Sequence, residues 1–136
     1  MTLYLLDTNI VSYIVRGKSQ AARTKLARLK ESEIGCISTI TEGELHFGLA
    51  KNPNPRLRGV LDSFLNKLRI VPWGRDEALV YGDLRAKLER EGKMLGNMDL
   101  LIAAQAICMD AVLVTNDRSF SQVDDLHATV NWATDL

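Results

Sequence analysis

The stretch that decides the fold is Leu95–Phe120, which reads LGNMDLLIAAQAICMDAVLVTNDRSF. Its first half predicts a helix that is opened by Asp99 and is apolar on most sides, so we expect this helix to be buried. Its second half, Ala111–Thr115, predicts a short interior strand, and Asp117 stands just past the carboxyl end of that strand. Because open α/β sheets bind ligands at the carboxyl ends of their strands, the stretch places two acidic side chains where chemistry is expected.

The rest of the chain alternates short apolar runs with helical patterns. Leu3–Leu6 predicts a buried strand that stops at Asp7, and a short helix follows it and ends at Gly17. Further strands are predicted at Ile34–Ser38 and Ile70–Val71. Helices are predicted at Gln20–Lys30, from Thr39 to about Lys51, along the stripe Leu57–Leu68 and at Asp76–Arg90. Such alternation implies an α/β fold, a three-layer α/β/α sandwich around a mostly parallel central sheet.

Length and composition indicate the number of domains, the state of the cysteines and the expected location of the protein. With 136 residues and 46% hydrophobic content, the chain is expected to form one domain, residues 1–136, with a full core and no disulfides. Cys36 and Cys108 lie in apolar segments without a CxxC spacing, so we expect both thiols to be reduced and buried. The sequence shows no leader peptide and no long apolar run, which favours a cytoplasmic protein without a membrane segment.

The net charge is zero, but the basic residues are unevenly distributed. One segment without any acidic residue contains Arg16, Lys18, Arg23, Lys25, Arg28 and Lys30. Such a cluster can contact phosphate groups, or it can be an ordinary solvated helix face. The sequence alone leaves both interpretations open.

Four carboxylates are expected to gather at one edge of the sheet. Asp7 and Asp117 follow strands, Asp99 opens a helix, and Glu44 lies near the start of another helix. Each of the three aspartates also has a structural explanation, as a helix cap, a turn cap or a partner of a helix dipole. Unit charges about 4 Å apart repel by about 4 kcal/mol at an effective dielectric constant of about 20, so such a cluster needs protons or a cation. An oxygen-only ligand set favours Mg²⁺, or alternatively Mn²⁺, over zinc.

Four motifs carry a family resemblance: LLDTNI from Leu5, ISTITEGELHFG from Ile37, LGNMDLLIAAQA from Leu95 and LVTNDRSF from Leu113. Their order and spacing resemble those of PIN-domain ribonucleases of the VapC toxin type. The resemblance implies a PIN-like fold and Mg²⁺-dependent cleavage of RNA, for example tRNA, by the toxic component of a toxin–antitoxin pair. It also implies inhibition by a cognate VapB-type antitoxin and assembly into a homodimer.

The resemblance assigns the site residues by position. The acidic quartet is matched by Asp7, Glu44, Asp99 and Asp117, and the supporting polar positions by Asn9 and Thr115. Asp7 and Asp99 are the expected direct Mg²⁺ ligands. Glu42 is a competing candidate, but it lies about 200° from Glu44 on a helix, so both cannot face one metal ion. The family's E-L-x-x-G pattern selects Glu44, and Gly48 leaves open space above this side chain.

The expected chemistry is hydrolysis of a phosphodiester bond by a metal-activated water, which yields a 5′-phosphate and a 3′-hydroxyl. Two other classes stay open. A Mg²⁺-binding receiver-like signalling domain also gathers acids at a sheet edge, but it requires adjacent acids and a lysine, whereas this chain has Asp7-Thr8-Asn9. A stable aspartyl-phosphate formed from acetyl phosphate would identify a receiver-like domain. Absence of Mg²⁺ binding would favour an interaction domain without nuclease activity.

Overall fold

A computed structural model describes residues 1–136 and shows a five-stranded sheet in the order β3-β2-β1-β4-β5. All four strand pairings are parallel. The strands are β1 (Thr2–Leu6), β2 (Glu33–Ser38), β3 (Arg69–Val71), β4 (Val112–Val114) and β5 (Ala128–Val130). Since β1 is central, Leu5 pairs with Cys36 on one side and with Leu113 on the other. The carboxyl ends of β1 and β4 therefore lie next to each other, at the shared edge that the sequence predicted for a parallel sheet.

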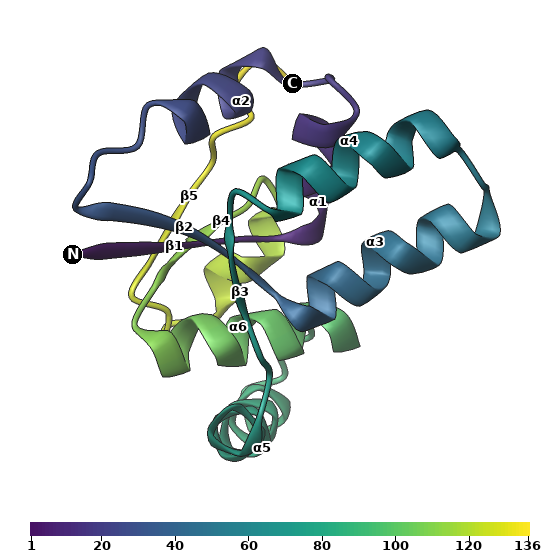
Figure 1. The fold of residues 1–136 in the computed structure, drawn as a ribbon. Coiled ribbons are helices and arrows are strands. Elements are labelled where there is room, and N and C mark those ends of the chain that lie inside the picture. Colours follow the sequence, from purple (N-terminus) through teal and green to yellow (C-terminus); the bar gives the residue numbers. More distant parts are fainter.

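Helices cover both faces of the sheet (Figure 1). They are α1 (Thr8–Val15), α2 (Gln20–Ala27), α3 (Thr39–Lys51), α4 (Pro55–Leu65), α5 (Arg75–Arg90) and α6 (Asn97–Met109), with a 3₁₀ turn η1 (Arg118–Gln122) after β4. Alternate strand residues face opposite layers: Leu5 packs in a core with α5 and α6, and Leu6 packs in a core with α1, α3 and α4. These two cores confirm the expected three-layer α/β/α sandwich.

Several details differ from the sequence-based expectations. The fourth helix begins at Pro55 and ends at Leu65, whereas the apolar stripe predicted it along Leu57–Leu68. The second helix ends at Ala27 rather than Lys30, because the Glu33 side chain accepts a hydrogen bond from the Lys30 N–H and the chain turns before β2. Neither β5 nor η1 was predicted. Cys36 is buried, but Cys108 is exposed, so the prediction of a buried Cys108 was wrong. It lies in the last turn of α6, and since this helix is apolar on most sides, its sequence does not show which side faces away from the sheet.

None of the six α-helices combines the length and the apolar composition needed to cross a membrane.

Candidate active site

Asp7 joins the central strand to the first helix. It follows β1 directly and is the N-cap of α1, where its Oδ1 accepts a hydrogen bond of 2.9 Å from the Ile10 N–H. Its Oδ2 accepts a hydrogen bond from the Thr115 hydroxyl, and only 6% of the residue is exposed. The structural explanation of Asp7 as a helix cap is thus correct, but capping alone does not require a carboxylate to be buried next to other acids.

Thr115 connects Asp7 to the next acid of the quartet. Its hydroxyl donates to Asp7 and accepts from the Asp117 N–H at 3.0 Å. The Asp117 Oδ1 in turn accepts from the Ser119 N–H at 2.9 Å, which caps η1. One buried hydroxyl therefore fixes the Asp7 carboxylate and the backbone of Asp117 relative to each other.

Glu44 reaches the same edge of the sheet from α3. Its Oε1 accepts a hydrogen bond of 2.7 Å from the hydroxyl of Thr8, the residue that follows Asp7. The Thr8 hydroxyl also lies 3.3 Å from that of the fully buried Thr41. A Cβ added at Gly48 would meet no atom within 4 Å, so the space on this side of α3 is open. Sequence reasoning missed Thr8, because a threonine in the first turn of a helix looks like an ordinary helix-start residue.

Asp99 lies in the first turn of α6 and is half-buried. The pKa of its carboxyl group is raised above the usual value, first by burial and then by the negative charges of Asp117 and Glu44. The pKa of Asp7 is raised to about 6, first by burial and then by the charges of Asp99 and Asp117, while the hydrogen bonds from Thr115 and Ile10 oppose the rise. These mutual effects show that the four predicted acids share one electrostatic environment.

Asn9 is the predicted supporting residue whose side chain forms no hydrogen bond to the acids. Its side chain is exposed on the outer surface of α1, while Asp7 and Thr115 are buried. It is the second residue of α1, after Thr8 and the N-cap Asp7. Asn9 is thus an exposed residue close to Asp7 in the chain, and its supporting role stays a prediction.

The donor set suits a hard cation. None of the four acids forms an ion pair with a lysine, arginine or histidine, since all salt bridges of the chain involve other carboxylates. No three acidic, histidine or cysteine side chains are close enough to form a complete metal cage as they stand. Each Asp7 oxygen accepts one hydrogen bond and keeps a further lone pair. The residues thus fit a divalent ion that keeps several waters, as Mg²⁺ usually does.

The raised pKa of Asp7 predicts a pH dependence of stability. The folded chain holds this proton up to about pH 6, whereas the unfolded chain loses it near 3.8. The free energy of unfolding of the metal-free chain should therefore fall as pH rises from about 4 to about 6, by up to about 3 kcal/mol from this group. Urea titrations in EDTA at several pH values, for the wild type and Asp7→Asn, isolate the contribution of Asp7 to the free energy of unfolding. If the difference between the two proteins does not change with pH, Asp7 does not titrate as described.

A second layer of polar contacts holds α6 in place. The Trp73 indole N–H donates to the Leu101 carbonyl at 2.9 Å, and the Trp73 backbone N–H donates to the Thr39 hydroxyl at 3.2 Å. The fully buried Gln105 side chain donates to the Val71 and Pro72 carbonyls, both at 3.2 Å. The segment after β3 thus connects α3, which carries Glu44, to α6. Only the isolated glutamine within an apolar helix could have indicated such a role from the sequence.

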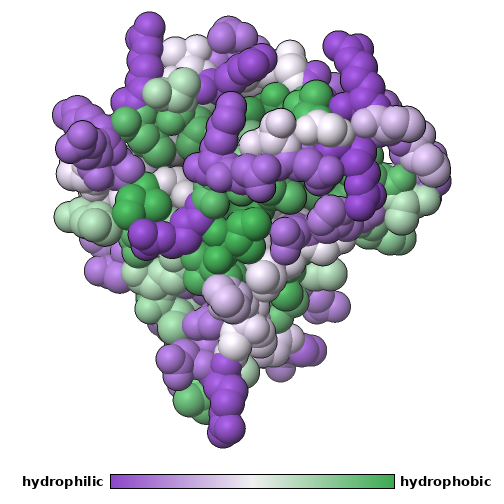
Figure 2. Space-filling model, in the orientation of Figure 1, coloured by the Kyte–Doolittle hydropathy of each residue, from purple (hydrophilic) through white to green (hydrophobic).

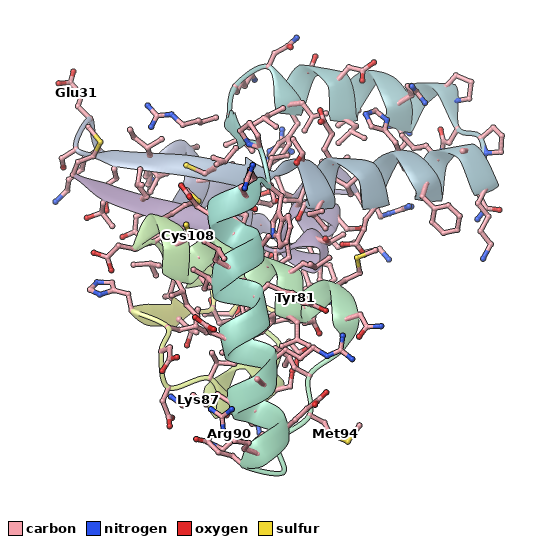
Figure 3. The ribbon with its side chains drawn as sticks, turned by 90° about the horizontal axis from the view of Figure 1, so that it is seen from below. Glu31, Tyr81, Lys87, Arg90, Met94 and Cys108 are labelled. Carbon is pink, nitrogen blue, oxygen red and sulfur yellow. The ribbon has the colours of Figure 1, made fainter.

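The loop before α6 is tied to the segment after Asp117. The Gln122 amide donates to the Met94 carbonyl at 2.9 Å and to the Ser119 carbonyl at 3.1 Å. Met94 itself is exposed on the loop beyond the end of α5 (Figure 3). Lys93 adds a salt bridge of 3.7 Å to Asp124. These contacts hold the loop before Asp99 against the segment that follows Asp117.

An acidic edge on a parallel α/β/α sandwich is the arrangement of a PIN domain, and the PIN domain family model matches residues 4–126. The chain belongs to this family, and within it to the VapC type. It is 36% identical over 132 residues to ribonuclease VapC2 of Rickettsia felis, covering 96% of this chain and 98% of the relative. It is 31% identical over 135 residues to the tRNA(fMet)-specific endonuclease VapC of Shigella flexneri, covering 98% of this chain and 100% of the relative.

Solved structures agree with this assignment. The DNA-bound VapBC2 complex of Rickettsia felis contains a chain that superposes with a TM-score of 0.90 at 35% identity, covering 96% of this chain and 99% of that one. A chain of the DNA-bound VapBC complex of Salmonella typhimurium gives a TM-score of 0.88 at 31% identity, with 97% and 99% coverage.

Proposed function

We propose that this chain is a Mg²⁺-dependent endoribonuclease, the toxic component of a toxin–antitoxin pair, which hydrolyses RNA phosphodiester bonds through Asp7, Glu44, Asp99 and Asp117. The observation that carries the proposal is a set of four carboxylates at one edge of the sheet with no cationic side chain paired to any of them. The absence of a paired lysine also disfavours a receiver-like signalling domain. The relatives named as ribonucleases and endonucleases support the choice of RNA.

In this proposal Asp7 and Asp99 hold Mg²⁺ directly, and Glu44 and Asp117 complete the site through direct or water-mediated contacts. Mn²⁺ is an alternative ion for the same oxygen ligands. When bound, the ion supplies a Lewis acid for the phosphoryl oxygens and lowers the pKa of water.

The chain's own hydroxyl groups keep the carboxylates in place: Thr115 orients Asp7, and Thr8 orients Glu44. Water attacks the scissile phosphorus in line as the P–O3′ bond breaks, and the leaving O3′ takes up a proton, so the products would be a 5′-phosphate and a 3′-hydroxyl.

The partners follow from the relatives. Because the similar solved structures are VapBC complexes, we propose that a VapB-type antitoxin binds and inhibits this chain. We also propose a homodimer, because large apolar side chains are exposed on two helices: Phe47 on α3 is 67% exposed and Leu79 on α5 is 73% exposed. Figure 2 shows hydrophobic side chains that reach the surface near the middle of one face, bordered by hydrophilic ones. A tRNA is the first substrate to test, since one relative is named for tRNA cleavage.

Sequencing the 5′ ends of cellular RNAs after induction of the chain tests the proposed activity and identifies the substrate. The wild type should create new 5′ ends at a small number of discrete positions, and cells that express the Asp99→Asn variant should lack them. The proposal is contradicted if the wild type and the variant give the same set of 5′ ends.

Metal binding should be visible without any substrate. An ion that binds only the folded state raises stability by about 2.7 kcal/mol at a hundredfold excess over its dissociation constant, which shifts the melting temperature by several degrees. Millimolar MgCl₂ should therefore raise the melting temperature of the wild type and of the control Asp83→Asn, whose carboxylate is exposed on α5, but not that of Asp99→Asn. A melting temperature that does not respond to Mg²⁺ beyond the effect of NaCl at equal ionic strength would argue against the site.

A further inference from the structure

The outer surface of α1 carries a row of polar side chains that the proposed chemistry does not use. The row consists of Asn9, Ser12, Tyr13 and Arg16, which we call the α1 stripe. Their spacing of three, four and seven residues places them on one side of the helix. The opposite side is buried in the core through Ile10, Val11 and Ile14. Asn9 and Arg16 are exposed, and Ser12 and Tyr13 are half-buried, so the stripe is open to solvent.

The stripe begins at the acidic edge of the sheet. Asp7 caps α1, and Asn9 is the second residue of the helix. Halfway along, the Tyr13 hydroxyl accepts a hydrogen bond of 3.4 Å from the side-chain amide of Asn116, which stands between Thr115 and Asp117. The stripe is therefore continuous with the candidate active site on two sides, through the helix start and through the end of β4.

The stripe ends at a cationic group suited to bind phosphate. The Arg16 Nε donates to the Ser12 hydroxyl at 3.3 Å, which lays the guanidinium along the helix. No carboxylate pairs with Arg16, so its remaining N–H groups are available to a ligand. Arg16 also borders a cleft of about 1000 Å³ whose lining contains Arg23, Arg56, Lys67 and Arg69 but only one acidic residue, Glu33. The far end of the stripe thus lies in a positive environment.

RNA binding needs such a surface. Four carboxylates at the site repel the phosphates of the RNA, and one divalent ion offsets this repulsion only at the scissile group. Favourable contacts must therefore come from residues beyond the site. Arg16 lies nine positions after Asp7, about 14 Å along a helix, which corresponds to up to about four stacked nucleotides at about 3.4 Å each.

We propose that the α1 stripe is the path of the single-stranded RNA on one side of the scissile bond, and that Arg16 binds one of its phosphates. The polar groups of Asn9, Ser12 and Tyr13 lie between the two ends, where they can contact sugars and base edges, as is usual for recognition of single-stranded RNA. This inference rests on the proposed function, since it requires RNA as the ligand of the acidic site.

The test is binding of a labelled twelve-residue oligouridylate to Arg16→Gln and to the matched control Arg90→Gln. Arg90 is an exposed arginine at the far end of α5 (Figure 3). Binding is measured by fluorescence anisotropy in Ca²⁺, under conditions in which the RNA stays intact, over a range of salt concentrations. Loss of one charged contact should raise the Kd of Arg16→Gln about tenfold or more and reduce the slope of log K against log salt by about 0.7. Arg90→Gln should change neither quantity by more than about twofold.

A length series makes the test sharper. With a two-residue oligouridylate, which is too short to reach Arg16 from the site, Arg16→Gln should bind as the wild type does. Equal binding of the twelve-residue RNA by both arginine variants would contradict the proposal that RNA follows the α1 stripe. A raised Kd of Arg16→Gln for the two-residue RNA would contradict it as well. Failure of the wild type to cleave any RNA in Mg²⁺ would instead reject the proposed function, so the two failures are distinguishable.

Discussion

Replacing Asp99 by asparagine should abolish RNA cleavage, with a loss of about a thousandfold or more, while the fold is retained. Removal of a direct metal ligand that contributes about 4 kcal/mol to transition-state stabilisation lowers the rate by about a thousandfold. Folding should not suffer, because burial and the charges of Asp117 and Glu44 raise the pKa of Asp99 and make its ionised form unfavourable without metal. The favourable effect of an acid at a helix start is only about 0.3–1 kcal/mol.

Two measurements on the same protein check this result. Cleavage of a defined RNA in Mg²⁺ gives the activity, and urea unfolding in EDTA gives the metal-free stability, with Asp83→Asn as the control for loss of a remote carboxylate. We expect Asp99→Asn to be as stable as the wild type or more stable. Substantial cleavage by this variant, or its unfolding in EDTA, would mean that Asp99 serves mainly to stabilise α6.

Replacing Glu44 by glutamine should remove nearly all RNA cleavage, whereas Glu42→Gln should retain most of it. Glu44 accepts a hydrogen bond from Thr8, next to Asp7, and its charge raises the pKa of Asp99. Glu42 makes no such contact, and the two side chains are separated by about 200° of helical rotation. As the acid in the first turn of α3, Glu42 interacts favourably with the helix dipole, so its replacement should cost up to about 1 kcal/mol of stability.

The two glutamate variants are each other's control, because they remove the same charge from the same helix. The measurement is the cleavage rate of both purified proteins on one RNA at saturating Mg²⁺, together with their melting temperatures. The opposite ranking would move the metal site to the other side of α3 and contradict the geometry described above.

Elements with strong local signals could be predicted from the sequence. The third helix runs from Thr39 to Lys51 as expected, because Ser38 caps it and the Asn52-Pro53 break follows it. Strand β5 was missed because it has only three residues, Ala128–Val130, and its middle residue is exposed, so it has no apolar run. Cys108 was misplaced because a helix that is apolar on most sides carries no periodic signal for its outer face.

In the site, too, features set by neighbouring residues could be predicted, whereas contacts between distant residues could not. Asp7 and Asp117 could be placed at one edge because strands β1 and β4 are parallel neighbours and each acid follows its strand. The hydrogen bond from Thr8 to Glu44 joins residues that are 36 positions apart, and that from Gln105 to Val71 joins residues 34 apart. No local pattern encodes such pairs, since they depend on how helices from distant parts of the chain pack on the sheet.

The most direct test of the central claim, metal-dependent hydrolysis of RNA by the four acids, is the chemistry of the product ends. Purified wild type is incubated with a labelled RNA in Mg²⁺ and in EDTA, and the 5′ and 3′ ends of the fragments are identified enzymatically. We predict fragments with 5′-phosphate and 3′-hydroxyl ends in Mg²⁺, and intact RNA in EDTA. Fragments with 2′,3′-cyclic phosphate and 5′-hydroxyl ends, formed equally in EDTA, would contradict the account, because the ribose 2′-hydroxyl would then be the nucleophile and the acidic edge would not be needed.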